Sequence, residues 1–236
     1  MHESVDQHHL ERILQNNEDL AAHNREHFDD LGLLAINLMS GPGAGKTTLL
    51  EKSLTGLSDD NRCSVIEGDM VGELDAERLR RNGVDVSQIS TGRSCHLDAQ
   101  MVARVLHAKA YSGVDFLFIE NVGNLVCPAE FPLGEHKRVV LLSVTEGDDK
   151  PLKYPVIFHR CDAVIFSKCD LLPYVSFNIE RAMKTLKDLN PAIRCFAVSA
   201  VSGEGIEAWL DWLKETREQV KLEQAEKSDD SLLKAQ

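Results

Sequence analysis

The segment Ser40-Gly41-Pro42-Gly43-Ala44-Gly45-Lys46-Thr47 decides the fold class of this 236-residue chain. It follows the apolar stretch Leu33–Met39 and opens the helical pattern of Lys46–Leu57, which is the strand-loop-helix context of a P-loop. Glycines let the backbone wrap closely around phosphates, with its N–H groups pointing inward. The small side chain of Ser40 fits the place of the first consensus glycine. A glycine-rich turn without a ligand is the alternative, and the complete motif disfavours it.

Outside this segment, short apolar stretches alternate with helical patterns. The expected strands are Leu33–Met39, Cys63–Glu67, Val86–Ser90, Asp115–Glu120, Arg138–Val144, Ala163–Ser167 and Arg194–Val198, and the expected helices are Lys46–Leu57, Glu73–Arg81, Leu97–Tyr111, Phe177–Asp188 and Gly205–Gln219. This alternation predicts a doubly wound α/β fold, with a mostly parallel sheet flanked by helices. An amphipathic helix over Leu10–Phe28 should precede it. We therefore divide the chain into an N-terminal helical segment (1–30), a P-loop GTPase domain (31–221) and a polar, irregular C-terminal tail (222–236).

Composition excludes several classes of protein. The net charge of -12 disfavours nucleic acid as a partner, because phosphate backbones are bound through basic surface. No apolar run approaches the roughly 20 residues that cross a bilayer. The first residues lack a basic region followed by an apolar stretch, so we expect a cytoplasmic protein with no membrane contact. The six cysteines are irregularly spaced, which does not suggest a disulfide framework.

The P-loop assigns roles to its residues. Lys46 should reach the β- and γ-phosphates, and the Thr47 hydroxyl should bind Mg²⁺. A second magnesium ligand is expected in Glu120, at the end of an apolar strand, although a solvated strand-end carboxylate is the alternative. Gly123 could bring its N–H to the γ-phosphate, and Asp69 is a candidate near the metal or the attacking water. The nucleotide-binding residues expected in the P-loop are Gly41, Gly43, Ala44, Gly45, Lys46, Thr47 and Thr48.

The base is predicted by Ser167-Lys168-Cys169-Asp170, which resembles the Asn-Lys-x-Asp guanine element of GTPases with Ser in place of Asn. The Asp170 carboxylate can accept bonds from the N1–H and 2-amino groups of guanine, which adenine does not offer there. The stem of Lys168 would cover the ring. Ser199 and Ala200, after the last strand, resemble the loop that contacts the guanine oxygen. Losing Asn at position 167 should remove a contact to base and loop. A small-molecule kinase is a weaker alternative.

Three residues form a candidate metal site: Cys95, His96 and Cys127. Thiolate and imidazole suit Zn²⁺ or Ni²⁺ rather than Mg²⁺. The spacing matches no zinc-finger pattern, so a structural role is the alternative. However, Cys127 lies seven residues beyond Glu120, in the loop expected to sense the γ-phosphate. A fourth ligand could be water or a cysteine of a second subunit. The other cysteines are expected to be small buried residues.

These elements together resemble the HypB family, the nickel-handling GTPases of nickel–iron hydrogenase maturation. The similarity covers nearly the whole chain, and its most specific parts are Glu120–Cys127 and Gly147–Pro155. The resemblance implies a GTP-promoted homodimer, with Cys95, His96 and Cys127 holding Zn²⁺ or Ni²⁺ near the interface. It also implies nickel transfer to the hydrogenase large subunit with help from a HypA-like accessory protein. The N-terminus carries neither a cysteine-rich nickel motif nor a histidine tract, so the internal site should carry the metal function.

The predicted activity is slow hydrolysis of GTP to GDP and phosphate, with Lys46, Thr47, Asp69 and Glu120 as the catalytic residues. No arginine finger or water-positioning Gln can be assigned from the sequence, so turnover should be low without dimerisation or a partner. Two alternatives stay open. One is a urease nickel GTPase similar to UreG, although UreG carries a contiguous Cys-Pro-His motif. The other is a nucleotide-gated metal-binding protein whose hydrolysis is incidental.

Overall fold

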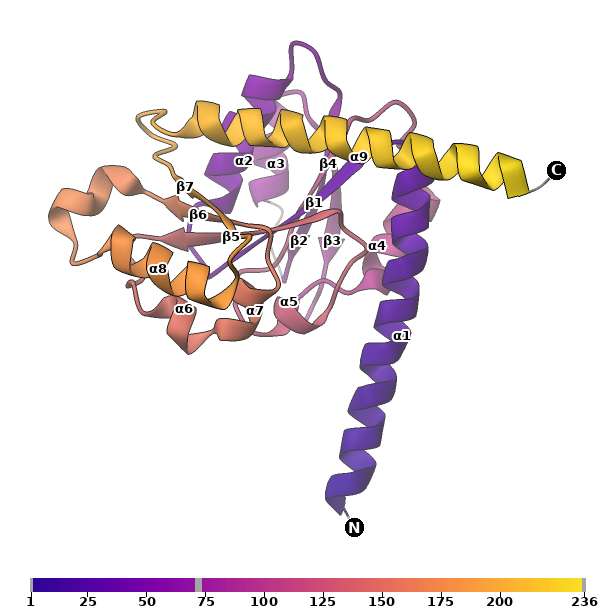
Figure 1. Cartoon of the computed structure of the whole chain (residues 1–236), viewed down its shortest axis with the longest axis horizontal. Helices are drawn as coiled ribbons and strands as arrows, with labels where there is room; N and C mark the ends of the chain where they lie inside the picture. Colours follow the sequence, from indigo (N-terminus) through magenta and orange to yellow (C-terminus); the bar gives the residue numbers. More distant parts are fainter. Residues whose placement is uncertain (1, 71–73, 235–236) are drawn as a thin grey trace.

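A seven-stranded parallel sheet, in the order β3-β2-β4-β1-β5-β6-β7, forms the centre of the computed structural model (Figure 1). The structure describes residues 2–70 and 74–234, and the side chains of 8–70 and 74–227. The strands are β1 (Leu34–Ser40), β2 (Cys63–Asp69), β3 (Asp85–Ser90), β4 (Phe116–Glu120), β5 (Lys137–Ser143), β6 (Ala163–Ser167) and β7 (Arg194–Ala197). The predicted fold class is confirmed, and each predicted strand is present to within two residues at either end.

Strand β1 is buried along its whole length, and its side chains alternate between the two faces of the sheet. Leu34 and Ile36 pack with helices α2 (Lys46–Leu57) and α9 (Ile206–Lys234) on one face. Ala35 packs on the other face with α1 (His2–Asp30) and α4 (Ala99–Ala108). Because β1 pairs with β4 on one side and β5 on the other, the strand order reverses there. Ligands of such sheets bind at this position, beyond the carboxyl ends of the strands.

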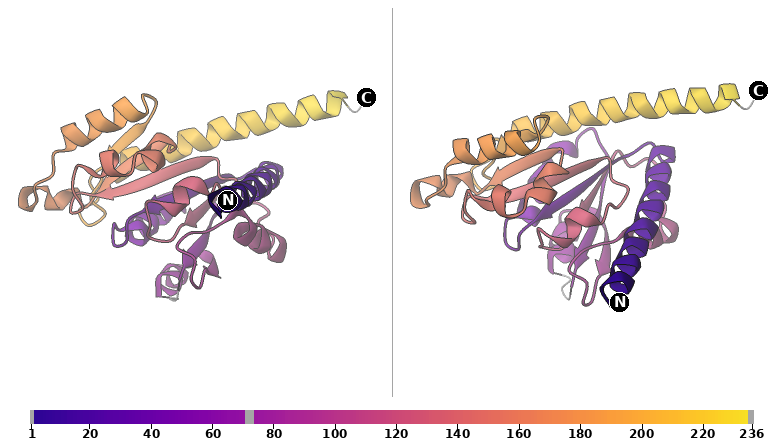
Figure 2. Two further views of the ribbon diagram at one scale, coloured as in Figure 1. Left: turned by 90° about the horizontal axis from the view of Figure 1, so that it is seen from below. Right: turned by 60° about the horizontal axis from the view of Figure 1, so that its bottom comes forward.

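The remaining helices complete the two layers around the sheet (Figures 1 and 2). They are α3 (Leu74–Arg81), α5 (Cys127–Glu130), α6 (Lys150–Lys153), α7 (Pro155–His159), the 3-10 helix η1 (Cys169–Tyr174) and α8 (Ile179–Leu189). The sequence did not predict α5, α6, α7 or η1, because segments of four to six residues are too short to show helical periodicity. Glu73, the predicted start of the third helix, lies outside the described residues.

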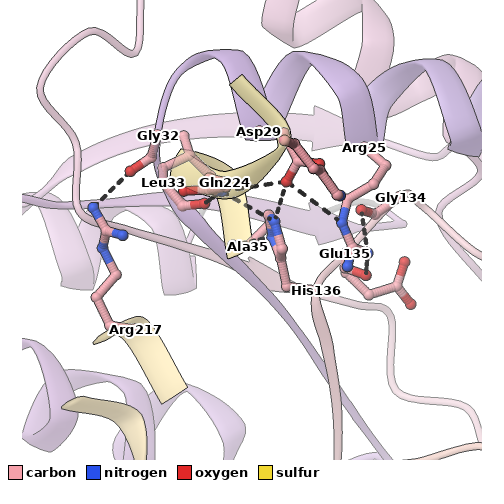
Figure 3. A network of polar contacts seen from close by, with 11 residues as sticks. Arg25, Asp29, Gly32, Leu33, Ala35, Gly134, Glu135, His136, Arg217 and Gln224 are labelled. Carbon is pink, nitrogen blue, oxygen red and sulfur yellow. Dashed lines mark hydrogen bonds and ion pairs between the residues drawn. The ribbon is translucent and has the colours of Figure 1, made fainter. Parts of the chain in front are cut away.

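The prediction of an irregular tail after residue 221 is wrong in its secondary structure, because α9 continues as one helix to Lys234. Polar contacts fix this extension. The Gln224 amide donates to the Leu33 carbonyl (3.1 Å), and Lys227 Nζ donates to Asp29 (2.9 Å), as Figure 3 shows for Gln224. Such contacts leave no apolar periodicity in the sequence. Within the described residues, no helix combines the length and the apolar character needed to span a membrane.

Candidate nucleotide and metal site

The P-loop forms a cradle between β1 and α2. Gly43 and Gly45 have φ values of 73° and 96°, in the left-handed region that favours glycine, and Gly45 directly precedes the helix. The Lys46 side chain is buried, and its Nζ donates to Ser40 Oγ (3.0 Å). Burial lowers the pKa of Lys46, while the negative charge of Glu120 opposes that change. The serine at the first consensus position therefore fits and also holds the lysine in place.

Glu120 lies at the carboxyl end of β4 beside the start of α2. Its Oε1 accepts a hydrogen bond from Thr47 Oγ1 (2.8 Å), whereas Oε2 is buried with no hydrogen-bond partner in the described part of the chain. Glu67 is paired with Glu120 in the register of β2 and β4, and its Oε2 also lacks such a partner. Burial raises the pKa of Glu67 to about 8 and that of Glu120 to about 7. Two buried carboxylates with unsatisfied oxygens fit a divalent cation of the kind that prefers oxygen ligands.

Glu67 is a functional candidate that the sequence reasoning missed. It ends an apolar segment just as Glu120 does, and this similarity was the available signal. Asp69 lies two residues further, at the end of β2 and thus at the same sheet edge, where its carboxylate accepts a bond from the Met70 N–H (2.6 Å). The structure therefore places three acidic residues at the edge of the sheet where magnesium was predicted.

Gly123 brings the loop after β4 against the P-loop. A Cβ atom built on Gly123 would lie 2.9 Å from Pro42 Cα, which is backbone and cannot move aside cheaply. The approach of the two loops thus requires glycine at this position, and it places the Gly123 backbone beside the phosphate cradle.

The predicted guanine element also reaches the P-loop. Ser167 Oγ donates to the Ala44 carbonyl (2.7 Å), and Lys168 Nζ donates to the Gly43 carbonyl (2.7 Å). Lys168 has a φ of 60°, an unusual conformation for a residue with a side chain. We expected the replacement of Asn by Ser at position 167 to remove a contact with a loop. This expectation is wrong for the P-loop, because the Ser167 hydroxyl itself donates to the Ala44 carbonyl.

Asp170 lies at the other end of this element and meets the loop after β7. Its Oδ1 accepts a hydrogen bond from Ser199 Oγ (2.7 Å), and Ala200 is the next residue of that loop. The structure therefore brings together Lys168, Asp170, Ser199 and the P-loop, which the sequence had connected only by motif order.

Cys95, His96 and Cys127 converge although 32 residues separate the two cysteines. One ligand atom from each residue lies within 4.8 Å of the others, and Cys95 Sγ is 3.2 Å from Cys127 Sγ. His96 Nδ1 is 4.0 Å from Cys95 Sγ, and the imidazole packs on Phe131 with 4.1 Å between ring centroids. Burial lowers the pKa of His96, which favours the neutral imidazole that binds metals. The donor set fits Zn²⁺ or Ni²⁺.

The other four cysteines do not join this cluster. Cys161 is buried and Cys63, Cys169 and Cys195 are half-buried. Burial raises the pKa of the Cys63 thiol to about 12, so this residue carries little thiolate at neutral pH. These positions agree with the interpretation of small, packed side chains.

Comparison with known proteins identifies the family. Residues 34–197 match the nucleotide-binding domain of the CobW/HypB/UreG family. Hydrogenase maturation factor HypB of Escherichia coli K12 is 48% identical over 205 residues, which span 87% of this chain and 71% of that protein. A crystal structure of HypB from Helicobacter pylori in complex with nickel has a TM-score of 0.81 at 40% identity, covering 86% of this chain and 96% of that chain. HypB from Archaeoglobus fulgidus also gives 0.81, at 39% identity over 86% of this chain and 99% of that chain. The P-loop site, the matched domain and the identity over most of its length show that this chain belongs to the HypB family of CobW/HypB/UreG nucleotide-binding proteins.

Proposed function

We propose that the protein is a GTP-hydrolysing nickel metallochaperone for nickel–iron hydrogenase maturation, in which the nucleotide state controls metal binding and release. The observation that carries the proposal is the convergence of Cys95, His96 and Cys127 in loops that continue from β3 and β4, beside the nucleotide site. The names of two relatives support it, because one is a hydrogenase maturation factor and the other was crystallised with nickel.

The preference for GTP over ATP follows from Asp170. Its carboxylate offers acceptors to the N1–H and 2-amino groups of guanine, and adenine would leave these acceptors unpaired. The Lys168 side chain reaches the P-loop through its Nζ, and its methylenes would cover the base. Ser199 and Ala200 supply the loop for the guanine oxygen.

Hydrolysis would depend on positioning and electrostatics. The P-loop N–H groups and Lys46 stabilise negative charge on the phosphates. Thr47 and Glu120 would hold Mg²⁺, with Glu67 nearby, and Mg²⁺ when bound supplies further charge neutralisation. Asp69 is the candidate for orienting the attacking water. These groups stabilise charge without an assigned arginine finger, so we propose slow turnover in the absence of a partner.

The metal would need a fourth ligand in addition to Cys95, His96 and Cys127. Tetrahedral coordination leaves a fourth position for water or for a cysteine of a second subunit. We therefore propose a homodimer promoted by GTP, acting in the cytoplasm with a HypA-like accessory protein and delivering nickel to the hydrogenase large subunit.

The test is titration of the purified protein with Ni²⁺ and with Zn²⁺, in the presence of GDP and of a non-hydrolysable GTP analogue. Cys95→Ala and Cys127→Ala should abolish tight binding, whereas Cys63→Ala serves as the matched control and should bind as the wild type does. Affinity or stoichiometry should differ between the two nucleotide states, and the oligomeric mass should rise with the GTP analogue. Metal binding that ignores both the cysteines and the nucleotide would refute the metallochaperone proposal.

A second experiment separates hydrolysis from simple nucleotide binding. A variant that binds GTP but does not hydrolyse it should fail to support hydrogenase maturation. Full maturation with that variant would favour a nucleotide-gated metal-binding protein in which hydrolysis is incidental.

A further inference from the structure

Two loops carry the metal donors, and asparagine side chains connect them. We name residues 91–97 the cysteine loop, which follows β3 and carries Cys95 and His96, and residues 121–127 the switch loop, which follows β4 and ends at Cys127. Both asparagines of the switch loop, Asn121 and Asn124, contact the cysteine loop.

Asn121 is 1% exposed at the junction of both loops with the central strand. Its Oδ1 accepts hydrogen bonds from the N–H of Leu97 (3.1 Å) and of Val122 (3.0 Å), and its Nδ2 donates to Asn37 Oδ1 on β1 (3.3 Å). The Asn121 N–H donates to the Leu38 carbonyl (3.0 Å). The backbone directly after His96 is thus tied to the P-loop strand.

Asn124 makes the second connection. Its Nδ2 donates to the Cys95 carbonyl (3.2 Å), and its Oδ1 accepts from the Val126 N–H (3.0 Å). The same side chain therefore fixes the turn that leads into Cys127 and the backbone of Cys95. Together the two asparagines hold the carbonyl of Cys95 and the N–H of Leu97, on both sides of His96.

The cysteine loop is also tied within itself. Thr91 Oγ1 donates to the Ser94 carbonyl (2.7 Å), and Ser94 Oγ donates to the His96 carbonyl (2.9 Å). A loop held in this way responds to its anchors as one unit, so the anchors determine where Cys95 and His96 lie relative to Cys127.

We propose that Asn121 and Asn124 are positioning residues of the metal site, which preassemble Cys95, His96 and Cys127 by fixing the cysteine loop on the switch loop. This inference rests on the proposed function, because it concerns the same three donors. Groups that orient metal ligands without touching the metal change affinity by about 10- to 100-fold.

The experiment measures Ni²⁺ affinity in the full-length protein by titration, following the thiolate-to-nickel charge-transfer absorption. Asn124→Ser keeps a hydroxyl acceptor for the Val126 N–H but cannot reach the Cys95 carbonyl, and Asn121→Ala removes the other anchor. The matched control is Asn178→Ser, which exchanges the residue whose side chain caps α8 on the β6 side of the sheet, where serine is also a good cap.

We expect Asn124→Ser and Asn121→Ala to lower the Ni²⁺ affinity about 10- to 100-fold, with the charge-transfer band restored at saturation. The affinity for GDP should stay within about twofold of wild type, as it should in the control. A purely structural defect would instead weaken nucleotide and metal binding together, and that result would overturn the proposal. Since Asn121 is buried, its variant could fail to fold, and the half-buried Asn124 then decides the matter.

Two failures remain distinguishable. If Asn124→Ser binds Ni²⁺ as tightly as wild type while Cys95→Ala and Cys127→Ala lose it, the positioning role is refuted and the metal site stands. If wild-type binding survives the cysteine substitutions, the proposed function is refuted and this inference with it.

Discussion

His136 is held in an arrangement that only its neutral imidazole can satisfy (Figure 3). The Ala35 N–H donates to His136 Nδ1 (3.0 Å), so this nitrogen must be unprotonated. Nε2 lies 2.9 Å from Asp29 Oδ1 and donates to it. The Gln224 amide also approaches Nε2 (3.4 Å), but it already donates to Asp29 and to the Leu33 carbonyl. A second proton on the ring would break a buried bond of the central strand β1.

The pKa of His136 determines how much folding stability changes with pH and in which direction. Burial, together with the positive charge of Arg25, lowers this pKa to about 4 from the ordinary histidine value of 6.5, although Asp29 opposes the change. In the unfolded chain the imidazole takes up a proton near its ordinary pKa, whereas in the folded protein it does not. Stability is therefore lost as the pH falls from about 6.5 to about 4. Between pH 7 and pH 5 the loss amounts to about 2 kcal/mol.

The titration of Asp29 does not reverse the direction in which stability changes with pH. Burial alone would raise the pKa of Asp29, but hydrogen bonds from Lys227, His136 and Gln224 outweigh it and hold this pKa below its ordinary value. The carboxylate is thus ionised throughout the range in which unfolded His136 titrates, and its own contribution to stability is lost only at more acidic pH.

The assay is urea unfolding at pH 7, 6 and 5 of protein freed of metal and nucleotide, followed by the fluorescence of the buried Trp209 and Trp212. Because carboxyl groups also titrate in this range, the informative quantity is the difference between wild type and His136→Asn, whose amide oxygen can still accept from Ala35. The wild type should lose about 2 kcal/mol more than this variant on acidification. The matched control, His8→Asn on the exposed surface of α1, should follow the wild type. Equal slopes in wild type and His136→Asn, or a wild type that gains stability on acidification relative to the variant, would refute the reasoning.

Three further predictions concern the nucleotide site and α1. Gly123→Ala should weaken binding of a GTP analogue about 10- to 100-fold in equilibrium titration, because its Cβ would meet the Pro42 backbone at 2.9 Å. Asp170→Asn should lower GTP affinity by a similar factor in competition experiments and leave ATP affinity unchanged, since only guanine uses the carboxylate. Asn24→Ala should destabilise the protein by about 2 kcal/mol or more in urea, because it removes two buried hydrogen bonds, to the carbonyls of Ala99 and Leu133. An unchanged unfolding midpoint for this last variant would show that α1 is not part of the cooperative fold.

Local sequence patterns predicted the central strands because these strands are buried. β1 and β4 are buried along their whole length, and such strands appear in sequence as continuous apolar segments. The extension of α9 could not be predicted in this way. It is held by Gln224 and Lys227 on residues about 190 positions earlier, and polar contacts of that range have no local signature.

The site was predicted from motif order, and geometry supplied what motifs omit. Glu67 and Glu120 each close an apolar segment of the sequence, but only the register between β2 and β4 shows that the two residues lie side by side in the sheet. The spacing of Cys95 and Cys127 was uninformative alone. Their convergence depends on β3, β2 and β4 being neighbours, which is a property of the strand order.

The seven residues of the switch loop contact the nucleotide site, the cysteine loop and the metal site. Gly123 touches the P-loop, Asn121 and Asn124 hold the cysteine loop, and Cys127 is itself a metal donor. If this loop couples the sites at equilibrium, the factor by which GTP changes nickel affinity must equal the factor by which nickel changes GTP affinity. Both factors can be measured on the same sample. Unequal factors would mean that a further equilibrium differs between the two titrations, and the formation of the homodimer is the step whose mass measurement would reveal it.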